Sequence, residues 1–410
     1  MKIKTKSAGR LLALAMLGTV IALAGEGYAQ AQLPPPNRGP GPSPAAPRTG
    51  DPLPGLTAEQ LAAFGAGLAE FVNVETPQTG LGPIFNGASC VQCHNAPGPG
   101  GSSPIRVTRF GRVVNGQFDP LADKGGSLLQ RLAINRAARE VVPPEANVVA
   151  DRLSTPLFGA GLIEAIPDAA IDANARRQKP DGIRGRAVLI DDPVSGEQRV
   201  GRFGWKAQQA TLLAFSGDAY RNEMGITNRF FPTENAPNGD AALLAAHDLF
   251  ADPEDAPDPQ TGRSDIDNAA DFMRLLAPVA PLRKSASAAE GERLFGQIGC
   301  ATCHQPFMQT GPSPIAALDR KNVALYSDLL LHDMGALADG IAQAGATMRE
   351  MRTAPLWGLR LRQPFLHDGR AATVDEAIRA HDGEAAIVRE RYVRLAPLQM
   401  QQLLDFLRTL

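Results

Sequence analysis

Two short stretches determine how this sequence is interpreted: Cys90-Val91-Gln92-Cys93-His94 and Cys300-Ala301-Thr302-Cys303-His304. Each has the spacing Cys-x-x-Cys-His, and together they use all four cysteines of the 410-residue chain. This spacing lets two thiols add to the vinyl groups of one haem while the adjacent histidine binds the iron. The sequence therefore predicts two covalently bound haem c groups, attached at Cys90, Cys93, Cys300 and Cys303, with His94 and His304 as iron ligands.

Other uses of paired cysteines fit less well. A zinc site built from both pairs would join residues about 200 positions apart, whereas zinc ribbons usually keep their halves ~15–20 residues apart. A thioredoxin-like redox pair needs no histidine at the fifth position, and here that histidine occurs twice. Two disulfides are the ordinary expectation for an exported chain with four cysteines, but they would leave both histidines unexplained.

The first residues predict export. Four basic residues lie within positions 2–10, an apolar run covers 11–25, and small residues follow up to Ala31. This order is typical of a secretory signal peptide, and an apolar run of about 15 residues is short of the ~20 that span a bilayer. We expect residues 1–31 to be a cleaved signal peptide, residues 32–56 to be a proline-rich linker, and the mature protein to be periplasmic.

The composition sets limits on partners and core. The formal net charge is −2 and 20% of the residues are charged, which argues against a disordered chain and against nucleic acid as a partner. No later stretch is apolar enough to span a membrane, so no stable membrane span is expected. Aromatic residues make up only 5% of the chain, and two haem macrocycles would fill part of the core in their place.

Parallel segments in the two halves predict a duplicated unit. Residues 155–159 (TPLFG) parallel residues 354–358 (APLWG), and 209–212 (QATL) parallel 371–374 (AATV). We expect a mainly α-helical fold with two cytochrome c-like haem domains, at 57–284 and 285–410. The first domain holds extra residues, and 186–202 within them have the pattern of a small β-hairpin insertion.

The order of several further motifs resembles a known group. The stretches are GPIFN at 82–86, FGWKAQ at 203–208, YSDLLLHDMG at 326–335 and FLHDGR at 365–370. Around two Cys-x-x-Cys-His motifs, this order is similar to the bacterial di-haem cytochrome c peroxidase and MauG superfamily, in particular its di-haem oxidoreductase branch. The resemblance implies an N-terminal haem domain with the peroxide site and a C-terminal electron-transfer domain.

The resemblance also implies a second axial ligand for the C-terminal haem, after the FLHDGR motif. His381 occupies that position, where peroxidases usually have methionine, so we expect a bis-histidine haem with His304 and His381. The alternative interpretation is that His381 is a surface histidine at the end of a helix. The competing ligands are Met308, Met334 and Met351.

At the N-terminal haem the blocking ligand of typical peroxidases is missing, because no histidine lies between His94 and His247. The resemblance therefore implies an open iron that binds peroxide directly, unless Lys124 or Tyr220 occupies it. Peroxide cleavage needs an acid–base group, and the glutamate expected from the family corresponds to Glu223, with Glu164 as the alternative.

Trp205 matches the indole that relays electrons between the haems in the superfamily, and Trp357 is the alternative. The family's inter-haem calcium is doubtful, because Ser154 and Thr155 stand where an asparagine ligand is expected. The implied function is reduction of hydrogen peroxide with electrons from a small redox protein of cytochrome c or cupredoxin type. An oxygenase or substrate oxidase on the same scaffold and a non-enzymatic electron carrier are the alternatives.

Overall fold

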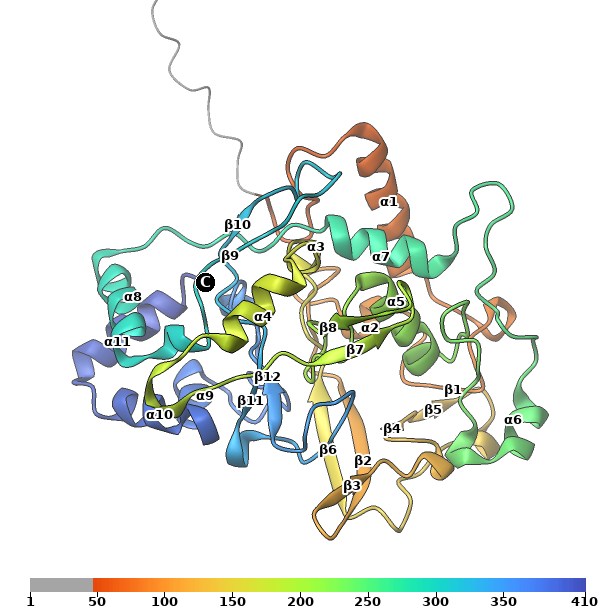
Figure 1. The fold of residues 1–410 in the computed structure, drawn as a ribbon. Helices are drawn as coiled ribbons and strands as arrows, with labels where there is room; N and C mark the ends of the chain where they lie inside the picture. The colour runs from red at the N-terminus through yellow and green to blue at the C-terminus, as the bar shows by residue number, and fades with distance from the viewer. Residues whose placement is uncertain (1–46) are drawn as a thin grey trace, which may run out of the picture. The chain divides into compact units, whose positions relative to one another are not determined.

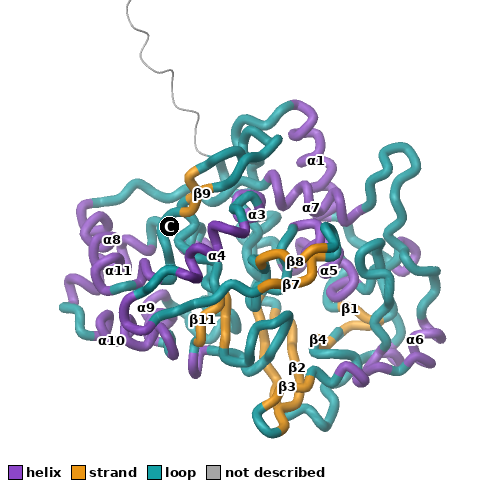
Figure 2. Tube along the Cα trace, in the orientation of Figure 1, coloured by secondary structure: helices purple, strands orange, loops and turns teal. Residues whose placement is uncertain are grey.

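Short helices and small sheets are joined by long loops in the computed structural model, which describes residues 47–410 (Figure 1). The α-helices are α1 (Ala58–Val72), α2 (Cys90–Cys93), α3 (Ala160–Glu164), α4 (Asp168–Arg176), α5 (Leu212–Ala219), α6 (Ala241–His247), α7 (Asp265–Leu275), α8 (Ala286–Ile298), α9 (Val374–Arg379), α10 (Ala386–Val393) and α11 (Pro397–Leu407). The strands are β1 (Ile84–Phe85), β2 (Arg106–Val114), β3 (Gln117–Asp119), β4 (Leu128–Leu129), β5 (Leu132–Ala133), β6 (Val148–Leu153), β7 (Leu189–Asp192), β8 (Glu197–Val200), β9 (Met308–Gln309), β10 (Asn322–Val323), β11 (Leu331–Asp333) and β12 (Glu350–Arg352). Loops make up much of the remaining chain (Figure 2).

The N-terminal predictions fall mostly outside this description. The expected signal peptide at 1–31 lies entirely outside the described residues, as does most of the expected linker. The last linker residues, however, belong to the fold. The side chain of Leu53 is buried, and removing it from water stabilises the folded chain. Its backbone N–H donates to the carbonyl of Leu275 at the end of α7.

Helix α1 begins where its capping residues predict. Thr57 accepts from the N–H of Gln60 at 3.2 Å, and the Gln60 side chain accepts from the N–H of Thr57 at 3.0 Å. The buried face of α1 then packs against α7, with the Phe64 and Phe71 rings 5.3 and 4.6 Å from the ring of Phe272. This pair of helices closes one side of the core around the first Cys-x-x-Cys-His motif.

Helices α8 and α11 form the corresponding pair around the second motif. The rings of Phe295 and Phe406 meet edge to face at 5.4 Å, and Tyr326 contacts both rings. Within residues 47–410, no helix combines the length and apolar character needed to cross a membrane.

The strands are more extensive than the mainly α expectation, which is therefore met only in part. Strand β2 pairs antiparallel with β3 and β4, and along residues 106–111 with β6 (Figure 1). Strands β4 and β6 both pair with β2 in this sheet, and the sequence predicted no strand in this region. The expected hairpin region does form a two-stranded unit, β7 with β8, in which Leu189 lies opposite Val200.

The two halves carry matching local features at the parallel segments. Gly159 and Gly358 both have positive φ, 71° and 72°, and each begins a helical turn. Thr211 caps α5 and Thr373 caps α9, each by accepting from the N–H three residues later. Such matches agree with a duplicated unit. The duplication itself and the domain boundary at 284–285 stay predictions.

Candidate functional site

The four cysteines form no disulfide and line two separate cavities. Cys90 and Cys93 belong to the single turn of α2 and line a cavity of about 170 Å³, called here the first cavity. Cys300 and Cys303 line a second cavity of about 200 Å³. Because the two pairs face different cavities, no tetrahedral site holds all four sulfur atoms, which argues against the zinc alternative.

The histidine of each motif is oriented by its backbone partner. Nδ1 of His94 donates to the carbonyl of Gly101 at 3.0 Å, and Nδ1 of His304 donates to the carbonyl of Tyr326 at 3.0 Å. Burial lowers the pKa of both imidazoles to about 4, so both are neutral at pH 7. Each Nε2 therefore keeps a free lone pair, which is the form that binds a metal.

A second histidine faces His304 across the second cavity. The ring centres of His304 and His381 are 6.4 Å apart, and Nδ1 of His381 donates to the carbonyl of Ala377 at 2.8 Å. Two imidazoles on opposite sides of one metal ion have ring centres about 6 Å apart, because each metal–nitrogen bond is about 2 Å. The spacing between His304 and His381 therefore suits two ligands of one metal ion. Met334 and Met351 also line this cavity, whereas Met308 does not and lies beside Asn174.

The first cavity has one histidine and, with it, two partly buried acids, Glu223 and Asp218. Glu223 lies in the π-helical turn Tyr220–Met224 that follows α5, and its Oε2 accepts from Nδ2 of Asn86 at 3.0 Å. Burial raises the pKa of Glu223 above the ordinary glutamate value. Asp218, five residues earlier and lining the same cavity, also has a pKa raised by burial.

Sequence reasoning missed Asp218 and Arg109, which both line the first cavity. Asp218 was detectable, because it precedes Glu223 in the same helical segment. Arg109 was not, because it reaches the cavity from β2, whose long-range pairing with β6 has no local signal. The positive charge of Arg109 lowers the pKa of Glu223 and of Asp218, which partly offsets the effect of burial.

The alternative acid, Glu164, and the two groups that could occupy the first iron, Tyr220 and Lys124, are placed differently from Glu223. Glu164 does not line either cavity. Its carboxylate accepts from the N–H of Leu212 at 2.7 Å and pairs with Nε of Arg274 at 2.7 Å, which supports the start of α5. Tyr220 lines the first cavity, but its hydroxyl donates to Glu70 at 2.6 Å. Lys124 does not line it.

Trp205 is the one residue in the described part of the chain that lines both cavities. Its indole N–H donates to the carbonyl of Leu153 at 2.7 Å, and its ring meets His367 edge-on at 6.1 Å. Trp357 lines neither cavity and borders a small void of about 40 Å³. The position between the cavities expected for a bridging indole is thus occupied by Trp205.

The region of the family's inter-haem calcium has another use here. The Ser154 hydroxyl donates to the carbonyl of Cys93 at 2.5 Å, and Ser154 and Thr155 both line the first cavity.

Charged groups at both cavities fit a ligand that carries carboxylates. Arg352 and Arg362 line the second cavity, form no ion pair within residues 47–410, and have pKa values lowered to about 10 by burial. Arg109 at the first cavity has a buried Nε without a partner. Haem brings two propionates to a largely apolar pocket, so these arginines and the apolar walls fit a haem in each cavity.

Comparisons with known proteins agree with this fit. Residues 143–410 match the family model described as "Di-haem oxidoreductase, putative peroxidase"; the match begins after the first Cys-x-x-Cys-His motif. No curated protein matches.

Three solved structures are distantly similar. Hydrazine synthase of Kuenenia stuttgartiensis is 14% identical, with 96% of this chain and 100% of that chain covered and a TM-score of 0.41. A MauG-like protein associated with microbial copper homeostasis is 15% identical, with 89% and 94% covered and a TM-score of 0.38. The diheme peroxidase BthA of Burkholderia thailandensis is 14% identical, with 85% and 86% covered and a TM-score of 0.39. These scores are low, and the assignment rests on the family model, by which the chain belongs to the di-haem oxidoreductase family.

Proposed function

We propose that this protein is an exported di-haem c-type oxidoreductase that reduces hydrogen peroxide at the first cavity, with electrons relayed from the second. The observation that supports this proposal most directly is that different residues line the two cavities. In the second, two of the four lining histidines, His304 and His381, have ring centres 6.4 Å apart, whereas the first has one histidine and the carboxyl group of Glu223. A site with ligands on both sides suits electron transfer, and a site with one ligand and an acid suits chemistry on a bound molecule.

When bound, haem iron supplies a coordination position and exchangeable electrons for the reaction H₂O₂ + 2 e⁻ + 2 H⁺ → 2 H₂O. In this proposal Cys90 and Cys93 attach the first haem and His94 holds its iron. Glu223 would take a proton from one oxygen of the peroxide and return it to the other, leaving oxygen. Asn86 keeps the carboxyl group in place through the 3.0 Å hydrogen bond to Oε2.

The second site takes electrons from a small redox protein in the periplasm, of cytochrome c or cupredoxin type. Cys300 and Cys303 attach its haem, and His304 and His381 bind the iron. Trp205 then connects the sites. Its backbone carbonyl accepts from the N–H of Arg352 at 2.8 Å, and its indole N–H is held by Leu153, so both ends of the residue are fixed.

The decisive experiment combines turnover with the resting spectrum. Holoprotein supplied with peroxide and a reduced small cytochrome c is expected to oxidise two donor molecules per peroxide. Electron paramagnetic resonance of the resting protein is expected to show one high-spin and one low-spin iron, because two histidines, His304 and His381, face each other in the second cavity, whereas His94 is the one histidine that lines the first. Two low-spin irons without turnover would instead identify an electron carrier. Peroxide use that requires an organic or protein substrate would identify a substrate oxidase.

The ligand role of His381 predicts a change in reduction potential. His381→Met should keep the second haem low-spin and raise its potential, because a thioether favours the ferrous state more than imidazole does. Redox titration followed by absorbance measures this shift. Met351→Leu is the matched control in the same cavity and should leave the potential unchanged. If His381→Met leaves spectrum and potential unaltered while Met351→Leu alters them, the ligand is Met351.

A further inference from the structure

Three acidic side chains outside both cavities lie close together with no basic side chain paired to them within residues 47–410. Glu234, Asp252 and Glu254 each place a carboxylate oxygen within 4.8 Å of the other two. Glu234 lies at the end of the segment that follows the Glu223 turn, and the other two lie in the loop between α6 and α7. None of the three forms an ion pair with lysine, arginine or histidine within residues 47–410.

Glu234 is the unusual member, because it is buried and only half satisfied. Its residue is 7% exposed, and Oε1 accepts from the N–H of Asn235 at 2.9 Å. Oε2 is fully buried and has no hydrogen-bond partner. Burial and then the charges of Glu254 and Asp252 raise the pKa of Glu234 to about 8. A buried carboxylate oxygen with no donor is costly unless a cation or a proton compensates it.

The hydroxyl oxygen of Thr227 lies beside the cluster and has two carboxylate oxygens within hydrogen-bond distance. Its buried hydroxyl lies 2.9 Å from Oδ1 of Asp252 and closer still to Oε2 of Glu254. A hydroxyl carries one hydrogen and can donate to one of these oxygens only. The hydroxyl oxygen also accepts from the N–H of Glu254 at 3.4 Å, so one lone pair remains beside the second carboxylate, an arrangement that a shared cation would stabilise.

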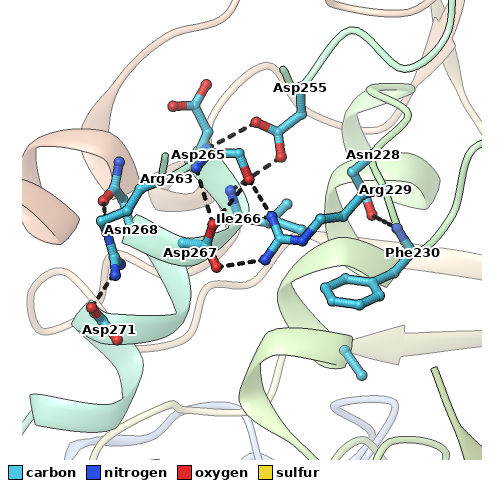
Figure 3. A network of polar contacts seen from close by, with 12 residues as sticks. Asn228, Arg229, Phe230, Asp255, Arg263, Asp265, Ile266, Asp267, Asn268 and Asp271 are labelled. Carbon is cyan, nitrogen blue, oxygen red and sulfur yellow. Dashed lines mark hydrogen bonds and ion pairs between the residues drawn. The ribbon is translucent and has the colours of Figure 1, made fainter. Parts of the chain in front are cut away.

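Acidic residues close by are compensated within the protein, as Figure 3 shows. Asp267 pairs with Arg229 at 2.6 Å, and Asp271 pairs with Arg263 at 2.7 Å. Asp255 accepts from the N–H of Asp265 at 2.8 Å, at the start of α7. Unlike Asp267 and Asp271, the cluster of Glu234, Asp252 and Glu254 has no basic side chain paired with it within residues 47–410, and Oε2 of Glu234 has no hydrogen-bond partner.

We propose that Glu234, Asp252 and Glu254, together with the hydroxyl of Thr227, bind a calcium ion. All the ligand atoms are oxygen, three carboxylates supply strong negative charge, and two of them come from an irregular loop. Calcium prefers oxygen ligands and tolerates irregular coordination, whereas magnesium demands near-ideal octahedral geometry. The residues differ from Ser154 and Thr155, so this site is separate from the inter-haem calcium position.

The ion would tie two segments together near the first cavity. Thr227 follows Glu223 by four residues, and its carbonyl accepts from the N–H of Asp255 at 3.1 Å. Asp252 and Glu254 immediately precede this contact. Calcium thereby fixes the loop that leads into α7 against the segment that leaves the Glu223 turn.

The test uses the holoprotein after removal of metal with a chelator. Titration with calcium chloride up to about 1 mM, followed by calorimetry and by elemental analysis, should show calcium binding in the natural protein. Glu234→Gln keeps the size of the side chain and removes its charge, and it should bind one equivalent fewer. Asp258→Asn is the matched control. Asp258 lies in the same loop, but its hydrogen bonds go only to residues 260–263 of its own turn.

Asp252→Asn, at an exposed position, provides a second test if Glu234→Gln does not fold, and unchanged haem absorbance verifies folding. Loss of the same equivalent in Asp252→Asn, with retention in Asp258→Asn, supports the site. Equal calcium binding by the natural protein and both cluster variants would overturn the proposal, as would absence of calcium binding by the natural protein. Neither outcome depends on peroxide turnover.

Discussion

Glu223→Gln is expected to slow peroxide reduction by ~10²- to 10⁴-fold, the usual contribution of a general acid–base residue. Glutamine keeps the size of the side chain and can still accept from Nδ2 of Asn86, but it cannot exchange a proton at neutral pH. Both haem absorbance spectra should therefore be preserved. Rapid mixing with peroxide, followed by the change in haem absorbance, measures the rate.

The pH profile gives a second readout of the same role. Burial raises the pKa of Glu223, and only the ionised carboxylate accepts a proton. The rate in the natural protein should therefore fall as the pH drops through this raised pKa, at a higher pH than for an ordinary glutamate. Glu223→Gln should lose this limb of the profile.

Glu164→Gln is the matched control for Glu223→Gln. Its carboxylate pairs with Arg274 and accepts from the N–H of Leu212, so the substitution should lower the free energy of unfolding while the rate stays close to that of the natural protein. A slow Asp218→Asn variant beside a fast Glu223→Gln variant would assign the proton transfer to Asp218. Full rates in all three variants would contradict a carboxylate-dependent mechanism.

Replacing Cys90 and Cys93 by Ala is expected to leave a chain with one covalent haem, because each cysteine pair lines its own cavity. Intact mass and the pyridine haemochrome assay count the attached groups. An empty first cavity of about 170 Å³ would also cost about 4 kcal/mol of unfolding free energy if its walls do not collapse. Thermal unfolding should show this loss.

The mirror variant, Cys300→Ala with Cys303→Ala, should likewise keep one haem but lose the bis-histidine spectrum instead. Two covalent haems in either double variant would contradict the attachment assignment.

The features that the sequence predicted are local ones. The Cys-x-x-Cys-His spacing and the position of His381 after the FLHDGR motif both depend on residues close in the chain. The two haem groups and the family follow from such motifs. The covalent attachment, the role of each residue and the cellular location stay predictions.

The features that the sequence did not predict depend on distant pairing. Arg109 faces the first cavity because β2 pairs with β6, about 40 residues further along the chain. The buried arginines of the second cavity are ordinary residues in the sequence, and only the folded chain shows that no carboxylate accompanies Arg352 or Arg362. Charge compensation between remote residues has no periodic pattern that a sequence could display.

Hydrogen bonds connect Glu223 to Asn86 and Gly87, which lie just before the first cysteine pair in the chain. The Nδ2 of Asn86 holds the Glu223 carboxyl group, while the N–H groups of Asn86 and Gly87 donate to the Glu223 carbonyl at 2.7 and 3.1 Å. Cys90, the first attachment point, follows only three residues after Gly87. If Cys90 attaches a haem and Glu223 transfers the proton, as proposed, one short segment carries the attachment point and positions the acid. A substitution within residues 86–90 would then disturb cofactor attachment and the position of the acid together.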